Sequence, residues 1–267
     1  MIKISFSKSC KKEILYKQIF KEINDLVLDS IQIVSILSFF IGGVVSIQMA
    51  LNIENPLLSK TLIGFATRQS VILEFAPFIS IIMAGKVGSY ITSSIGTMRV
   101  TEQIDALEVM GINSLNYLVF PKIIAMLLYP FVITISMFLG IIGGLLAMTL
   151  TGVPSEAYIQ GIQMDFDSYH ITYSYIKTLI FSFVLATVPE FHGYYMNGGA
   201  LYVGKASTKS FYFTSIIIII LNYMQILILE IDSSIKLFTL SEQKGTLKFE
   251  ILEELQDANG INYSCLL

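Results

Sequence analysis

The stretch GTMRVTEQIDALEVMG, residues 96–111, is a short charged segment between two long apolar regions. Thr97 near its start is a candidate N-cap, and Gly111 at its end is a candidate helix stop. We therefore predict one short helix here. Its polar positions are Arg99, Glu102, Gln103, Asp105 and Glu108.

This segment is predicted to be amphipathic. Val100, Ile104 and Leu107 recur at i, i+4 and i+7 and form one apolar stripe, whereas the charged residues lie on another face. The pattern leaves two interpretations equally open. The charged face either docks on a soluble partner, or it is a solvated face of a helix that only connects two spans.

Composition places the chain in a membrane. Of its 267 residues 54% are hydrophobic and only 14% are charged, with a mean hydropathy of +0.70. Ordinary soluble domains carry about 25% charged residues. The net charge of −3 gives no indication of nucleic-acid binding. Two cysteines and two histidines, scattered along the chain, predict neither a disulfide framework nor a metal site.

Five apolar segments are long enough to be predicted as membrane spans, so the expected fold class is an all-α polytopic membrane protein. The third is longer than one crossing needs and contains Pro130, so we expect a tilt, a kink or an interfacial turn. The fourth contains Lys177. The predicted spans are residues 30–53, 75–95, 123–155, 171–189 and 210–229.

Residues 1–29 carry six lysines and no cleavable signal pattern. They are interpreted as a basic amphipathic helix at the membrane interface, with a cytosolic helix packed on a partner as the alternative. Residues 151–170 contain no Lys or Arg. Positive loops favour the cytosol, so the N-terminus and the connectors 96–117 and 195–209 are predicted to be cytosolic. We therefore expect three parts: the basic amphipathic segment at 1–29, a membrane domain at 30–230 and a polar extension at 231–267.

A glycine motif in the second connector resembles a phosphate-binding loop. Gly199 to Lys205 fits the first seven positions of G-x-x-x-x-G-K, but Ala206 stands where Ser or Thr would hold magnesium. The motif also lies between two predicted membrane helices rather than after a buried strand. We therefore expect no nucleotide hydrolysis by this chain.

The opening stretch closely resembles the signature of MlaE-type (YrbE-type) permeases, the membrane subunits of lipid-trafficking ABC transporters. The resemblance continues upstream in LEFAPFISIIMAGKVGSYITSSIGTM (73–98) and downstream in NSLNYLVFPKIIAM (113–126). GGALYVGKAST (198–208) is similar to a later loop of the family. The match covers roughly residues 30–230.

The resemblance implies five spans, an interfacial N-terminal helix and a homodimer in the bacterial inner membrane. It also implies an ATPase subunit on the cytosolic face and a periplasmic MCE-domain protein, with phospholipid passing between them. The chain itself would be non-catalytic and without a cofactor, because ATP and magnesium belong to the ATPase. The coupling residues implied are Arg99, Glu102, Gln103, Asp105 and Glu108.

Three positions depart from the family pattern, and each departure removes a charge. Ser94 stands where a Glu is usual, Leu201-Tyr202 where Glu-Gly is usual, and Asn222 where an Asp is usual. The residues assigned to a lipid path or a dimer core are Glu74, Pro77, Lys86, Ser94 and Asn222.

Two of these residues carry charges. Lys86 is expected either to face the dimer core or a lipid phosphate, or to snorkel or pair structurally; the structural role is favoured. Glu74 is expected near the outer end of the second span, just before Pro77.

Other function classes make different demands. An ion-coupled secondary transporter needs paired halves and acids at the membrane midplane, but no second half is evident, and only Lys86 and Lys177 are expected to be buried charges. An intramembrane enzyme needs convergent polar groups at one depth, and the histidines and cysteines are scattered. A repurposed membrane scaffold is the remaining alternative.

Overall fold

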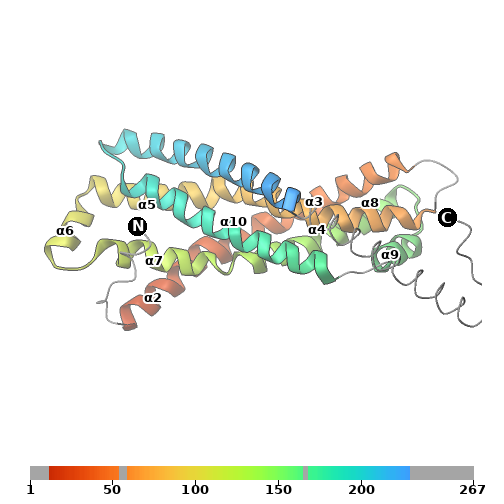
Figure 1. Ribbon diagram of the computed structural model, residues 1–267, viewed down its shortest axis with the longest axis horizontal. Helices are drawn as coiled ribbons and strands as arrows, with labels where there is room; N and C mark the ends of the chain where they lie inside the picture. The colour runs from red at the N-terminus through yellow and green to blue at the C-terminus, as the bar shows by residue number, and fades with distance from the viewer. Residues whose placement is uncertain (1–11, 54–58, 165–167, 229–267) are drawn as a thin grey trace, which may run out of the picture. The chain divides into compact units, whose positions relative to one another are not determined.

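A computed structural model describes residues 12–53, 59–164 and 168–228, and these are almost entirely helical (Figure 1). The chain divides into two compact units, Met1–Ile220 and Leu221–Leu267. The predicted extension at 231–267 lies outside the described residues, as do residues 1–11. Five helices are long and apolar enough to cross a membrane, which confirms the predicted number of spans and the all-α class.

The first span runs without a break from α2 (Lys12–Glu22) through a wide π-helical turn, η1 (Ile23–Leu28), into α3 (Asp29–Asn52). The helix therefore continues through residues 29 and 30, where the boundary between the N-terminal segment and the membrane domain was predicted. The interfacial location of the N-terminal segment stays a prediction.

The second span is longer than predicted, because helix begins at Thr61 and not near residue 75. It comprises α4 (Thr61–Met83), the π-helical turn η2 (Ala84–Gly88) and α5 (Ser89–Val100). Arg68 lies in this additional part of the helix. In the structure its side chain is buried, and its Nη1 donates to the carbonyl oxygens of Ile162 and Met164 at 2.8 and 2.7 Å. These carbonyl partners help a buried guanidinium to remain inside the helix bundle.

The third span also begins earlier than predicted, at Ser114. It comprises α7 (Ser114–Met126) and α8 (Tyr129–Leu150), joined by a turn at Leu127–Leu128. Pro130 follows at the start of α8, where its missing N–H costs little. Of the three expected departures from one regular helix, the structure shows a turn, within the span. The short helix α9 (Ser155–Gln163) follows α8.

The fourth and fifth spans are α10 (Ser168–Tyr194) and the helix Ala200–Ile228. The connector between them is only residues 195–199, so the predicted loop 195–209 is wrong at its second end. Lys205 and Lys209 belong to the last helix instead. A lysine near the end of a membrane helix can reach the interface along its long side chain, so these charges do not stop the helix.

Glycines allow α3 and α8 to pack at close range. A Cβ on Gly42 would meet the backbone of Gly140, and one on Gly143 would meet the carbonyl of Phe39. Small residues of this kind let membrane helices approach through their backbones. This contact joins the first and third spans.

Within the unit Met1–Ile220, the connectors α6 (Gln103–Val109) and 195–199 lie at one end, and α9 lies at the other (Figure 1). The first two are adjacent, since Met196 and Val203 pack against Gly96 just before α6. This arrangement is what five successive crossings require, because the second and fourth connectors must emerge on the same side.

Candidate functional site

The charged stretch forms a helix of its own after a sharp turn, not the single helix predicted from Thr97. Helix α5 continues to Val100, and the Oγ1 of Thr97 donates to the carbonyl of Ser93 at 2.7 Å inside that helix. Glu102 then adopts φ +57°, and it is the one non-glycine residue in the described ranges with positive φ. A single left-handed residue thus separates α5 from α6.

The other end of α6 is closed as predicted. Gly111 has φ +75°, and its N–H donates to the carbonyl of Glu108 at 2.9 Å. The N–H of Ile112 donates to the carbonyl of Leu107 at 3.0 Å. These two bonds form a Schellman motif, which satisfies the last carbonyls of the helix. Asn113 then caps the first turn of α7 by accepting from the N–H groups of Leu115 and Asn116.

The two faces of α6 differ as the spacing predicted. Ile104 is fully buried, and Val100 and Leu107 are half-buried. The polar residues Glu102, Gln103, Asp105 and Glu108 are exposed. The helix therefore lies with its apolar stripe against the bundle and its acids outward.

One ion pair links α6 back to α5. Nη1 of Arg99 lies 2.7 Å from Oδ1 of Asp105, with side chains 35% and 56% exposed. Pairs this exposed contribute roughly 0–1 kcal/mol. The main effect of this ion pair is to orient Arg99 across the turn at Glu102. Arg99 thus pairs with Asp105 and not with Glu102, which is nearer in sequence.

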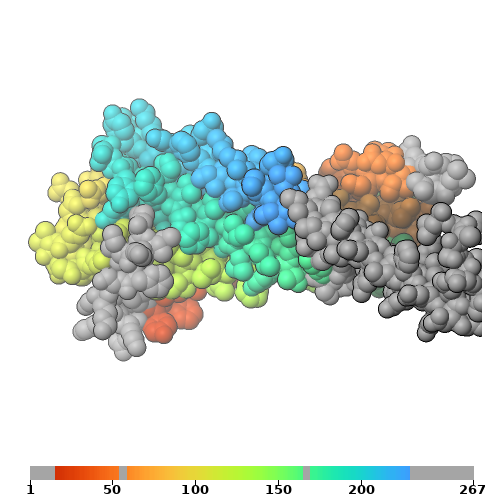
Figure 2. Space-filling model, in the orientation of Figure 1, coloured from red at the N-terminus to blue at the C-terminus, as the bar shows by residue number. Residues whose placement is uncertain are grey.

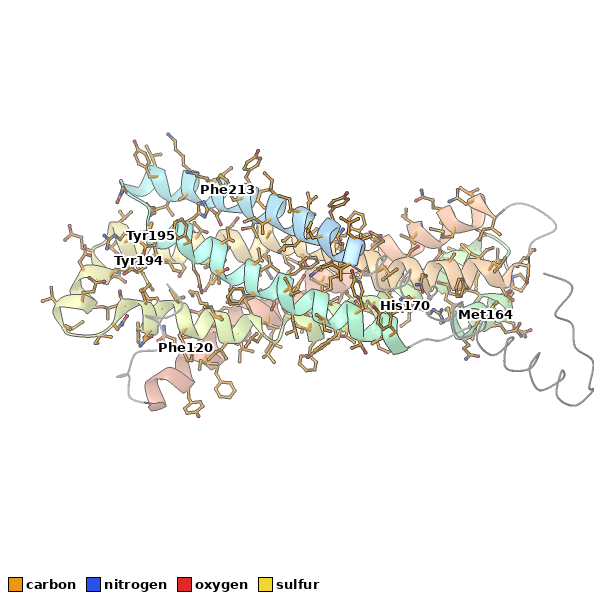
Figure 3. The ribbon with its side chains drawn as sticks, in the orientation of Figure 1. Phe120, Met164, His170, Tyr194, Tyr195 and Phe213 are labelled. Atoms are coloured by element: carbon orange, nitrogen blue, oxygen red, sulfur yellow. The ribbon has the colours of Figure 1, made fainter. Side chains whose placement is uncertain are left out.

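Glu108 ties α6 to two spans. Its Oε1 accepts from the Oγ of Ser114, at the start of α7, at 2.8 Å, and from the hydroxyl of Tyr194, at the end of α10, at 3.1 Å. The two hydroxyl oxygens are 3.0 Å apart. Figure 3 labels Tyr194 at the end of α10 that faces α6. These two bonds connect α6 to both α7 and α10.

The tip of α6 exposes two apolar side chains that the sequence analysis did not single out. Val109 is 89% exposed and Met110 is 66% exposed. Their position, directly before a glycine that ends a short amphipathic helix, was the available signal. Acids beside an exposed apolar tip are suited to contact with another protein, because apolar and methionine side chains are favoured at interface cores.

The second predicted group of residues is not brought together. Glu74 is exposed on α4, well inside the helix, so its predicted place at the span end is wrong. Pro77 is buried in α4, and Ser94 is half-buried on α5. Asn222 belongs to the second unit, in the last turns of the helix Ala200–Ile228.

Lys86 occupies the π-helical turn η2 and is half-buried. Its Nζ donates to the backbone carbonyl of Asp29 at 2.5 Å. Asp25 and Tyr90 line the same pocket. This carbonyl bond fits the structural role that the sequence favoured.

More charged side chains are buried than the two lysines that were expected to be. Lys177 is buried as expected, but so are Lys122 and Glu22, which form an ion pair of 2.5 Å between α7 and α2. Glu190 on α10 is 1% exposed, and neither carboxylate oxygen has a hydrogen-bond partner among the described residues. Glu190 lies one helical turn before the end of α10 and not at its middle. The midplane acid of an ion-coupled transporter is therefore not found in it.

A cavity of about 290 Å³ lies between α4, α8, α9 and α10. Its walls are mainly aliphatic, with Ile72, Ile133 and Ile141 among them, and Phe138, which lines it, is 67% exposed. Such a cavity is suited to a hydrocarbon chain.

No strand precedes Gly199 in the described residues, and residues 200–205 are already helical. The segment therefore lacks the strand-to-loop geometry of a phosphate-binding loop.

Comparison with known proteins identifies the family. Residues 19–228 match the family model described as permease MlaE. The chain is 32% identical over 198 residues to a probable ABC transporter permease protein of Rickettsia bellii, covering 73% of this chain and 76% of that one. It is also 32% identical over 198 residues to one of Synechocystis sp., covering 73% and 75%. A third, from Porphyra purpurea, is 31% identical over 188 residues, covering 68% and 70%. The chain with the exposed acidic helix α6 between its second and third spans therefore belongs to the MlaE family of ABC transporter permeases.

Proposed function

We propose that this chain is the membrane subunit of a phospholipid transporter and that a separate ATPase drives it by docking on α6. Membership of an ABC permease family implies an ATPase partner. The observation that carries the proposal is the geometry of α6. Its acids and its apolar tip face outward, while Glu108 is hydrogen-bonded to the ends of α7 and α10.

The coupling residues have separate roles in this proposal. Glu102, Gln103 and Asp105 present the polar docking surface, with Arg99 holding Asp105 in place. Glu108 does not mainly contact the partner; it passes the movement of α6 to the spans. The chain contributes no catalytic group and no cofactor, because ATP and magnesium are bound by the ATPase.

Phospholipid is the proposed cargo. The aliphatic cavity between α4, α8, α9 and α10 supports this, because a hydrocarbon chain gains free energy in such a site and a polar solute does not. The cavity lies toward the end of the unit that holds α9, opposite α6. With α6 in the cytosol, that end faces a periplasmic MCE-domain protein, which would receive or supply the lipid.

The remaining parts of the proposal concern assembly and location. Two copies of the chain form a homodimer in the bacterial inner membrane, with the N-terminus cytosolic. The six lysines of residues 1–29 support this orientation. Glu74, Pro77, Lys86 and Ser94 are spread over α4, η2 and α5, and Asn222 belongs to the second unit, so we assign none of them as a lipid ligand.

Co-purification of the full-length chain with its ATPase tests the proposal. Two variants of α6 are suited to this test. Glu102→Gly removes a carboxylate at a position where glycine tolerates the positive φ. Val109→Asp with Met110→Asp makes the exposed tip of the helix polar. We expect each to weaken ATPase capture by about tenfold or more, as loss of interface anchors does.

Glu156→Gln is the matched control, since Glu156 is an exposed acid on α9 at the opposite end. Unchanged capture in this control is expected. If the wild-type chain captured no ATPase, the transporter proposal would fail and the membrane-scaffold interpretation would replace it. If all variants captured it equally, α6 would not be the docking site.

A further inference from the structure

A second pocket, of about 330 Å³, lies at the α6 end of the unit Met1–Ile220, between the end of α10 and the start of the helix Ala200–Ile228. Figure 2 shows both segments (cyan) on the surface near α6 (yellow). The pocket is separate from the aliphatic cavity and from the docking face of α6. Its lining is Phe191, His192, Tyr195, Met196, Asn197, Tyr202, Lys205, Ala206 and Lys209.

The pocket is positively charged. Lys205 and Lys209 stand four residues apart on one face of the last helix. No acid lines the pocket, and neither lysine forms an ion pair with any residue that the structure describes. Both ammonium groups instead lie over aromatic rings, Lys205 at 5.2 Å from the Tyr202 centroid and Lys209 at 5.8 Å from that of Phe213. Two cations without a carboxylate partner leave this pocket suited to an anion.

The remaining polar groups of the pocket differ in what they offer an anion. Nδ1 of His192 lies 3.0 Å from the carbonyl oxygen of Val188, so a proton on this nitrogen is donated within α10 and not to the pocket. The His192 ring stacks on Phe213 at 5.5 Å, which joins α10 to the last helix. The amide of Asn197 and the hydroxyls of Tyr195 and Tyr202 add further donors.

Aromatic side chains around the pocket indicate a membrane boundary. Tyr195, Tyr202 and Tyr212 are 57%, 52% and 60% exposed, and Leu201 beside them is 85% exposed. Tyrosines gather where a membrane helix meets the headgroups, and lysines there contact anionic lipids. An anion at this level is more readily supplied by a headgroup than by solution.

We propose that this pocket binds a phosphate group carried by the headgroup of an anionic phospholipid, with Lys205 and Lys209 as its main ligands. A phosphate offers several acceptor oxygens to the two ammonium groups and the neighbouring donors. The site depends neither on ATPase docking nor on lipid transport. Lys205, which is the lysine of the G-x-x-x-x-G-K match, would thus bind phosphate from a membrane helix and not from a phosphate-binding loop.

The chain contains no tryptophan, so Tyr195→Trp places a single reporter in the pocket. The full-length protein in detergent would be titrated with soluble short-chain phosphatidylglycerol, short-chain phosphatidylcholine and inorganic phosphate, following tryptophan fluorescence. We expect a saturable response that needs about tenfold less phosphatidylglycerol than phosphatidylcholine, because only the former has net negative charge.

In the same background, Lys205→Gln with Lys209→Gln should weaken phosphatidylglycerol binding by about tenfold or more. The control Lys17→Gln with Lys60→Gln removes two exposed lysines outside the pocket and should leave binding within about twofold of the parent. Lys205→Arg with Lys209→Arg keeps both charges and should retain binding, which guards against a folding defect in the glutamine variant.

Equal responses to the two lipids, or equal binding by the glutamine variant and its control, would overturn the proposal. A lysine-dependent response to inorganic phosphate as strong as that to phosphatidylglycerol would overturn the lipid source and assign the pocket to free phosphate.

Discussion

The hydroxyl of Tyr194 donates a hydrogen bond of 3.1 Å to Oε1 of Glu108, and so joins the last turn of α10 to α6. The two residues are 86 positions apart in the chain. Ser114 makes a second bond to the same carboxylate oxygen. This contact separates docking on α6 from the transmission of its movement, and each can be disturbed alone.

Tyr194→Phe should leave ATPase capture intact but reduce the lipid-dependent ATPase rate several-fold. The change removes one hydrogen bond, worth about 1.5–3 kcal/mol when the acceptor is charged, and leaves the outward face of α6 unchanged. Capture and ATP turnover would be measured on the same reconstituted complex. Tyr16→Phe is the control, because Tyr16 is an exposed tyrosine on α2 and lines none of the pockets described above. An unchanged rate in Tyr194→Phe would mean that coupling does not pass through this bond.

The positive φ of Glu102 predicts an unusual tolerance at that position. Glu102→Gly should keep the thermal stability of the protein, whereas Glu102→Val should lower its free energy of unfolding by about 1–3 kcal/mol, because a β-branched residue is strained in the left-handed region. Melting temperatures in one detergent would compare the two. Equal destabilisation by both would show that the carboxylate, not the backbone conformation, matters here.

The buried pair Lys122–Glu22 should be costly to break on one side. Lys122→Met is expected to destabilise the protein by about 3–5 kcal/mol, since it leaves a carboxylate buried without its partner. Adding Glu22→Gln should restore part of the loss, and chemical unfolding would measure both. Lys86→Met, which removes a half-buried lysine bonded only to a carbonyl, should cost less. A Lys122→Met variant as stable as Lys86→Met would contradict the assignment.

Close packing of α3 on α8 makes Gly42 sensitive to the smallest addition. Gly42→Ala should destabilise the protein by about 1–3 kcal/mol or more, because the new methyl group would meet the backbone of Gly140. Gly204→Ala is matched in chemistry but meets open space in the last helix, so it should be neutral or stabilising by up to about 1 kcal/mol. Similar melting temperatures for the two variants would show that the helices can separate without cost.

The fold was largely predictable because its signals are local. Long uncharged runs marked five spans, the 3.6-residue period marked the two faces of α6, and Gly111 marked its end. The errors arose where distant contacts decide the outcome. Arg68 and Lys122 lie within helices outside the predicted spans, and their partners are distant in sequence: the carbonyls of residues 162 and 164, and the carboxylate of Glu22. Glu102 adopts a left-handed conformation although it is neither glycine nor asparagine, so its residue type did not indicate the turn.

The candidate site was likewise predicted only in part. The polar residues of α6 follow from spacing, but the role of Glu108 depends on Tyr194, which only the folded bundle brings near. The phosphate pocket likewise combines two helices, and the sequence offered its lysines only within a motif that pointed to a different chemistry.

The π-helical turn η1 changes the direction in which α2 faces around the axis of the first span, compared with a regular helix. A residue accommodated in a wide turn shifts everything before it by about 100° around the helix axis relative to a regular helix. Helix α2 is thereby aimed at α7, where Glu22 meets Lys122, while α3 keeps its glycine face on α8. Tightening this one turn into a regular helix would swing α2 away from Lys122 without bending α3. The wide turn η1 thus sets the direction in which α2 leaves the first span.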